Sequence, residues 1–134
     1  MTTEEKVKYW IKISDEDLRV AKDLLKSKHL LQTGFFCHLT IETIFKAYFT
    51  LLKDELPPYI HKLARLAQLS GFHDQMSDTQ KDFIYKLDPF NIEARYPEYK
   101  NMLAKSLNVQ ICKDLLQQTQ ELQLWIKEKI SLAK

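Results

Sequence analysis

A chain of 134 residues is long enough to form one domain with a sizeable hydrophobic core. Hydrophobic residues make up 45% of it, which excludes a disordered chain, and a net charge of only +2 predicts no broad phosphate-binding surface, although a local basic patch stays open. Two glycines and four prolines are too few for the repeated tight turns of a β-protein. The composition therefore favours long helices.

The cysteines and the N-terminal residues indicate a reducing, aqueous environment. Cys37 and Cys112 lie within apolar helical stretches, which predicts reduced, buried thiols rather than a disulfide. The spacings typical of a zinc site are absent, so we expect no metal and no cofactor. The first residues are polar and acidic, unlike a signal peptide, and no uninterrupted apolar run reaches the ~20 residues that span a bilayer. We expect a soluble cytoplasmic protein without a membrane partner.

Two long helices are predicted in the first half of the chain. The first begins at a capping box formed by Thr2 and Glu5 and runs to about residue 27. Its acidic residues 15–17 are interpreted as solvated surface, the last of them bordering the apolar stripe. The second helix, residues 30–53, is apolar on most sides, so we expect it to be central or to lie at a dimer interface.

The second half starts with a firm break at Pro57-Pro58, because two prolines cannot continue a helix. Gly71 is placed to end a helix, and Ser77 starts a second capping box. We expect, in order, a short helix over residues 59–70, a short helix over 77–87, an ordered loop over 90–100 and a long helix over 101–132. The chain is thus predicted to be a single all-α domain over residues 1–134, an up-and-down helical bundle of about five helices, three long and two short.

Three polar side chains, His38, Glu42 and Lys46, interrupt the apolar second helix at spacings of four residues and so lie along one side of it. Glu42 is either a buried acid that orients His38 or holds a cation from another element, or the partner of Lys46 in an ion pair at a half-exposed edge. Both interpretations stay open, because aromatic residues flank Glu42 on its own stripe.

His61 and Arg95 are the candidate site residues outside that helix. His61 follows the diproline, where it has either a structural role or that of a site residue held rigid by the turn. Arg95, in the predicted loop, either locks the loop through carbonyls or a carboxylate, with Glu42 as the candidate partner, or binds a phosphate. Glycine-rich phosphate loops and Gly-x-Ser-x-Gly elbows are missing, so catalysis has little support from motifs.

Four sequence blocks in this order resemble the HEPN (higher eukaryotes and prokaryotes nucleotide-binding) domain family. The blocks are Trp10…Leu18-x-x-Ala21-x-x-x-Leu25, Gly34-Phe35-Phe36-Cys37-His38…Glu42-x-x-x-Lys46-Ala47, Pro58-x-x-His61-x-Leu63-x-x-Leu66 and Glu93-Ala94-Arg95-Tyr96-Pro97. The resemblance to free-standing bacterial members implies a bundle of about five helices that is commonly a homodimer. It also implies a gene often found beside, or fused to, one for a nucleotidyltransferase, as in toxin–antitoxin-like pairs. The family's common motif positions fall on Glu42, Lys46, His61, Arg95 and Tyr96.

One departure from the family concerns catalysis. Many HEPN proteins are metal-independent ribonucleases with an arginine followed after four to six residues by a histidine, whereas no histidine follows Arg95 here. We therefore expect a non-catalytic module that binds a nucleotide or a nucleotidyltransferase partner, with Arg95, Lys46 and His61 facing phosphate and Glu42 and Tyr96 orienting them. The first alternative is a toxin-like ribonuclease acting on RNA through His61 and Arg95. The second is a purely structural interaction bundle.

Overall fold

The computed structural model describes residues 1–92 and 95–133 of the chain, and in this part all the regular secondary structure is helical, with no strand. The helices, in order, are α1 (Thr3–Lys26), α2 (Leu30–Lys53), α3 (Leu63–Leu69), η1 (His73–Gln75), α4 (Asp78–Leu87), η2 (Asp88–Phe90), α5 (Pro97–Lys105) and α6 (Val109–Ala133), where η denotes a single 3₁₀ turn. The predicted all-α class is confirmed. The described residues contain six α-helices instead of the predicted five.

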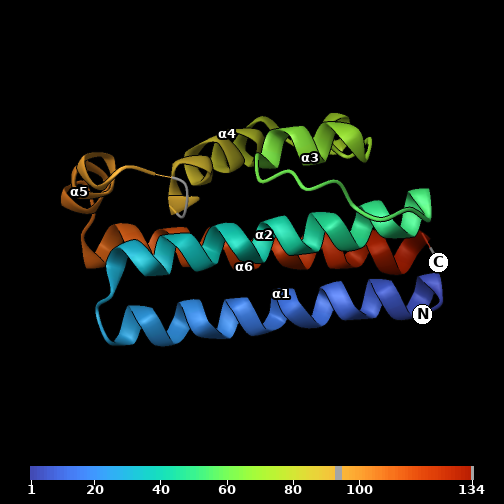
Figure 1. Cartoon of the computed structure of the whole chain (residues 1–134), viewed down its shortest axis with the longest axis horizontal. Coiled ribbons are helices and arrows are strands. Elements are labelled where there is room, and N and C mark those ends of the chain that lie inside the picture. The colour runs from blue at the N-terminus through green and yellow to red at the C-terminus, as the bar shows by residue number, and fades with distance from the viewer. Residues whose placement is uncertain (93–94, 134) are drawn as a thin grey trace.

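The three long helices form the body of the molecule and the short ones form a second layer (Figure 1). α1 and α2 run antiparallel along their whole length, and α6 packs against both of them, running in the same direction as α2. α3 and α4 lie on the opposite side of α2 from α6, and α5 stands at the end of the bundle remote from the two termini (Figure 1). Consequently α2 lies between the other two long helices and the layer of short helices.

The helix starts that were predicted from capping residues are confirmed. Thr2 accepts a hydrogen bond from the backbone N–H of Glu5, whose carboxylate accepts one from the backbone N–H of Thr2. Ser77 and Gln80 make the same reciprocal pair at the start of α4. Each pair satisfies two backbone donors that would otherwise lack a partner at the start of a helix.

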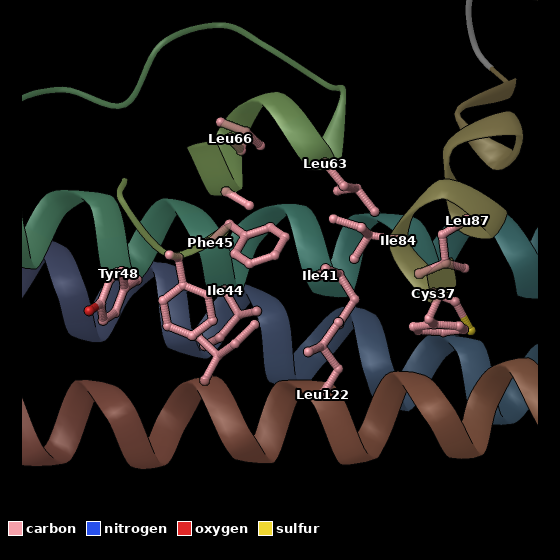
Figure 2. Packing of buried hydrophobic residues seen from close by; sticks show 14 of the residues in the cluster. Cys37, Ile41, Ile44, Phe45, Tyr48, Leu63, Leu66, Ile84, Leu87 and Leu122 are labelled. Atoms are coloured by element: carbon pink, nitrogen blue, oxygen red, sulfur yellow. The ribbon is translucent and has the colours of Figure 1, made fainter. Parts of the chain in front are cut away.

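The core is organised around α2, as its all-round apolar pattern predicts. Figure 2 shows side chains of α3 and α4 packing on one side of α2 and Leu122 of α6 on the other. By length and composition α2 could cross a membrane, but 72% of its most apolar window is buried within this chain, as expected for the central helix of a bundle. The hydroxyls of its four threonines each donate to the carbonyl oxygen four residues earlier, so they add no unmet donor to the core (Thr33, Thr40, Thr43 and Thr50).

A polar junction joins the three long helices inside the core. The hydroxyl of Ser14 in α1 donates to the carbonyl oxygen of Thr40 in α2, at 2.7 Å. The side-chain amide of Gln123 in α6 donates both to that hydroxyl and to a carboxylate oxygen of Asp15, each at 3.0 Å, and Lys127 pairs with the same Asp15 oxygen. Asp15 therefore also makes a structural contact to α6, while 42% of its side chain stays exposed, in line with the predicted surface position.

The remaining differences from prediction lie at helix boundaries. The predicted helix over 101–132 is two helices, because Asn108 accepts a hydrogen bond from the backbone N–H of Ile111 and starts α6 anew. The predicted loop over 90–100 is wrong from Pro97 onward, where α5 begins, because proline suits the first turn of a helix. The helix predicted from residue 59 starts only at Leu63, and it ends as predicted before Gly71, whose φ of +73° suits glycine.

Two further close contacts fix parts of the core. A Cβ atom on Gly34 of α2 would come within 2.2 Å of the ring of Phe90, so the absence of a side chain lets η2 pack directly on α2. Cys37 and Cys112 are free and buried as predicted. Burial raises the pKa of the Cys37 thiol to about 12.

Candidate functional site

Glu42 lies in the middle of α2 and only 4% of its surface is exposed. One carboxylate oxygen, Oε2, accepts a hydrogen bond from Lys46 Nζ at 3.0 Å, and the other, Oε1, accepts one from His61 Nδ1 at 3.1 Å. A buried carboxylate is tolerated when cations and hydrogen-bond donors surround it in this way. Both interpretations of Glu42 therefore hold in part. It pairs with Lys46 within the helix, but in a buried setting, and it also holds a residue from another segment.

The side chain of Lys46 is buried in the interior of the protein. Only 7% of it is exposed, and its Nζ lies 5.6 Å from the ring centroid of Trp10 in α1, in a cation–π arrangement. Between Glu42 and this ring, little of the ammonium group is left to face a ligand. The geometry thus gives Lys46 the role of a counter-charge for Glu42, and not that of the phosphate-facing group that was predicted.

His61 stands where the polar cluster reaches the surface. It lies in the non-helical segment between the diproline and α3, and 36% of its side chain is exposed. Because Nδ1 donates to Glu42, the tautomer with a proton on Nδ1 is favoured, which leaves Nε2 as a hydrogen-bond acceptor. The ring of Tyr59, which is 90% exposed, meets the imidazole edge-on with ring centroids 4.8 Å apart. Tyr59 and His61 thus present an aromatic ring and a fixed imidazole side by side.

His38 and Asp88 extend the cluster inward. His38 is fully buried, with Nδ1 3.7 Å from Glu42 Oε1 and Nε2 3.6 Å from Asp88 Oδ1. Asp88, in η2, also accepts a hydrogen bond at 3.0 Å from the backbone N–H of Leu63, the first residue of α3. The carboxylate of Asp88 therefore joins the start of α3 to η2, beside His38 of α2.

Asp17 brings a second carboxylate toward Glu42 from α1. It is half buried, and its pKa is raised to about 6, first by burial and then by the negative charges of Glu16 and Glu42. One sign of this is visible in the residue pattern, since Asp17 borders the apolar stripe of its helix.

Arg95 and Tyr96 lie apart from this cluster. Arg95 is exposed, and its guanidinium carbon is 5.0 Å from the ring centroid of Tyr99 in α5. Among the described residues no ion pair joins Arg95 to Glu42, so the predicted partnership between them is not formed. Tyr96 is exposed at the start of α5. The residues before them in the predicted motif, Glu93 and Ala94, lie outside the described part of the chain.

The arrangement is a carboxylate-held histidine at the edge of a buried charge cluster. Of the predicted site residues it unites Glu42, Lys46 and His61, and it leaves Arg95 and Tyr96 elsewhere. Sequence reasoning missed Tyr59 and Asp88, although both flank prolines, which often fix a backbone that presents side chains. In residues 1–92 and 95–133, no group of three or more histidine, cysteine, aspartate or glutamate side chains is arranged to hold a metal ion.

Comparison with known proteins agrees with this architecture. The sequence matches the HEPN domain over residues 7–130, which includes most of α1 and α6, all of α2 and the whole polar cluster. The chain belongs to the HEPN domain family. Searches of curated proteins and of solved structures gave no match.

Proposed function

We propose that this HEPN domain is a nucleotide-binding module that acts with a partner protein of the nucleotidyltransferase class and has no catalytic activity by itself. The observation that carries the proposal is the pairing of Tyr59 with His61 at the mouth of the Glu42 cluster. An exposed aromatic ring offers a surface on which a base can stack, a contact that is typically worth ~1–3 kcal/mol.

The phosphate end of such a ligand would meet His61 and its neighbour. Nε2 of His61 accepts a hydrogen bond in the neutral ring and donates one when the ring is protonated. Lys62, the next residue, is exposed and adds a positive charge beside it. Glu42 and Lys46 support the site indirectly, since they orient the imidazole without facing the ligand. Arg95 and Tyr96 enter the proposal as exposed contacts for a partner or for a longer ligand that spans both segments.

Calorimetric titration with AMP, ATP and GTP, with and without magnesium, tests the proposal. We expect binding by the wild type and about tenfold weaker binding by Tyr59→Ala, in line with the loss of one stacked base. Tyr85→Ala removes another exposed tyrosine, in α4, and serves as the matched control that leaves affinity unchanged. Absence of heat with every purine nucleotide would sink the proposal. Light scattering on the same samples measures whether the chain forms the homodimer that the family resemblance implies.

A second function, cleavage of RNA, is favoured by one specific observation. The Glu42–His61 pair has the geometry of an oriented general base, with Nε2 free to accept the proton of a 2′-hydroxyl. The predicted cation for the phosphate, Arg95, does not lie against this pair. Incubation of total RNA with the wild type and with His61→Ala separates the two functions, because a ribonuclease of this kind gives different RNA profiles for the two proteins and a binding module gives identical ones.

A further inference from the structure

His38 is buried in the centre of α2, yet neither of its ring nitrogens has a hydrogen-bond partner. Each nitrogen instead faces a carboxylate oxygen, Glu42 Oε1 at 3.7 Å and Asp88 Oδ1 at 3.6 Å. Both distances exceed those of a hydrogen bond, so the ring sits between two acceptors and is bonded to neither. Unpartnered buried polar atoms are rare in native proteins, and this one requires a reason.

The same two oxygens hold both sides of the segment that carries the candidate site. Glu42 Oε1 accepts the Nδ1 hydrogen bond of His61, and Asp88 Oδ1 accepts that of the backbone N–H of Leu63. His38 therefore lies between the two acceptors that hold residues 61–63, one on α2 and one on η2. We call the side chains of His38, Glu42 and Asp88 the 61–63 clamp.

The protonation state of His38 decides how the clamp is satisfied. A neutral imidazole carries a proton on one nitrogen only, so a lone pair faces one of the two carboxylates. The imidazolium carries a proton on both nitrogens and can donate to both carboxylates at once. We propose that His38 is a positioning residue that operates the 61–63 clamp, with proton uptake by its ring tightening the hold on residues 61–63 and proton loss loosening it.

The surrounding charges are compatible with such a device. Glu42, on the same helix, shares its charge with Lys46 and His61, and α1 brings Asp17 toward it. Asp88 comes from η2, and α6 brings the thiol of Cys112 toward Cys37, the residue before His38. Within the described residues no further carboxylate lies within 4 Å of the His38 ring. The His38 ring thus lies between the carboxylates of Glu42 and Asp88, and in the described part of the chain no other cation lies between these two groups.

Nuclear magnetic resonance of the wild-type protein tests the proposal directly. Ring ¹⁵N shifts distinguish the two neutral tautomers from the imidazolium, so a pH series follows proton uptake by the His38 ring. Over the pH interval in which the ring gains its second proton, hydrogen exchange at the Leu63 amide, corrected for its intrinsic pH dependence, should slow by about fivefold or more, the lower end of ordinary coupling. A His38 ring that keeps one protonation state throughout overturns the proposal, and this measurement needs no variant.

Two variants assign the effect to His38. His38→Gln keeps a donor and an acceptor but cannot take up a proton, so the pH dependence of Leu63 exchange should be lost, whereas His61→Gln should retain it. His29→Gln, in the exposed turn before α2, is the matched control that also retains it. A pH response that persists in His38→Gln, or that disappears in His61→Gln, overturns the assignment. Because the readout is the segment itself, the result stands apart from whether any nucleotide binds.

Discussion

The two segments that were predicted to form one site differ in how the fold treats them. His61, after the diproline, is held by a buried carboxylate in the middle of the central helix. Arg95 and Tyr96 are exposed at the start of α5, a helix without a single buried residue. The first segment is therefore positioned by the core and the second by its own local contacts. Charged residues that belong to the same family pattern do not have to meet in the folded chain. A buried counter-charge identifies the ones that do.

Removal of the Glu42 carboxylate, which holds the segment of His61, should have the largest effect on stability. Glu42→Ala leaves Lys46 buried without a counter-charge and frees His61, so we expect a loss of about 3–5 kcal/mol in the free energy of unfolding. Urea unfolding followed by circular dichroism measures it. Glu121→Ala, an exposed position on α6, should stay within about 0.5 kcal/mol of the wild type. A loss below 1 kcal/mol in Glu42→Ala contradicts the buried-cluster interpretation.

Gly34→Ala tests how firmly η2, the 3₁₀ turn that precedes the segment of Arg95, is packed on α2. The added methyl group meets the ring of Phe90 at a distance that real structures do not tolerate, so η2 must shift away from α2. Overpacking of this kind typically costs about 1–3 kcal/mol. Thermal unfolding of Gly34→Ala beside Gln32→Ala, an exposed change on the same helix, separates the clash from a general effect on α2. Equal stability of the two variants would show that η2 is free to move.

Asp17→Asn should stabilise the protein, and the gain should depend on pH. The folded-state pKa of Asp17, about 6, lies above its ordinary value of 3.8, so the folded protein binds this proton more tightly than the unfolded chain does. The resulting penalty is absent below about pH 4, grows through the interval, and is complete above about pH 6.

Because Asp17 is only partly buried, we expect a gain of about 1 kcal/mol at pH 7 and none at pH 4. Unfolding of both proteins at the two pH values measures it. Asp23→Asn, an exposed change on the same helix, is the control. A gain that is the same at both pH values contradicts the assigned cause.

Changes in the exposed segment should have the smallest effect on stability. Arg95→Ala and Tyr96→Ala remove side chains that lack a buried partner, so we expect shifts within about 0.5 kcal/mol. The same variants, titrated with nucleotide alone and then with a partner protein, show whether this segment contributes to binding. A loss of stability above 1 kcal/mol in Arg95→Ala would indicate a structural contact for its guanidinium.

Much of the fold is predictable because its signals are local. Capping boxes at Thr2 and Ser77, the break at Pro57-Pro58 and the all-round apolar pattern of residues 30–53 depend on neighbours in sequence. The division of the last predicted helix was missed because the residues around Asn108 carry no proline or glycine, and a single side-chain cap decided the boundary.

The site was predictable only where it follows the period of one helix. The stacking of Glu42 over Lys46 comes from a spacing of four residues, whereas the arrival of His61 at Glu42 depends on the path of residues 54–62, which no periodicity encodes. His61 came into consideration from its place after the diproline, and the expected pairing of Arg95 with Glu42 is not among the ion pairs of the described residues. Asp88 was read only as the end of a helix, because its contact with His38 joins residues fifty positions apart in sequence.

The buried thiol of Cys37 can report on how often the core opens. With no exposed surface and a pKa raised to about 12, it stays protonated and out of reach of alkylating reagents in the folded state near neutral pH. It faces the centre of the bundle, so a reagent gains access only when the packed layers separate (Figure 2). The rate of its alkylation in native buffer therefore reports the population of open states, or the opening rate itself where alkylation outpaces reclosing. The chain thus carries its own label for kinetic stability, without denaturant and without an introduced probe.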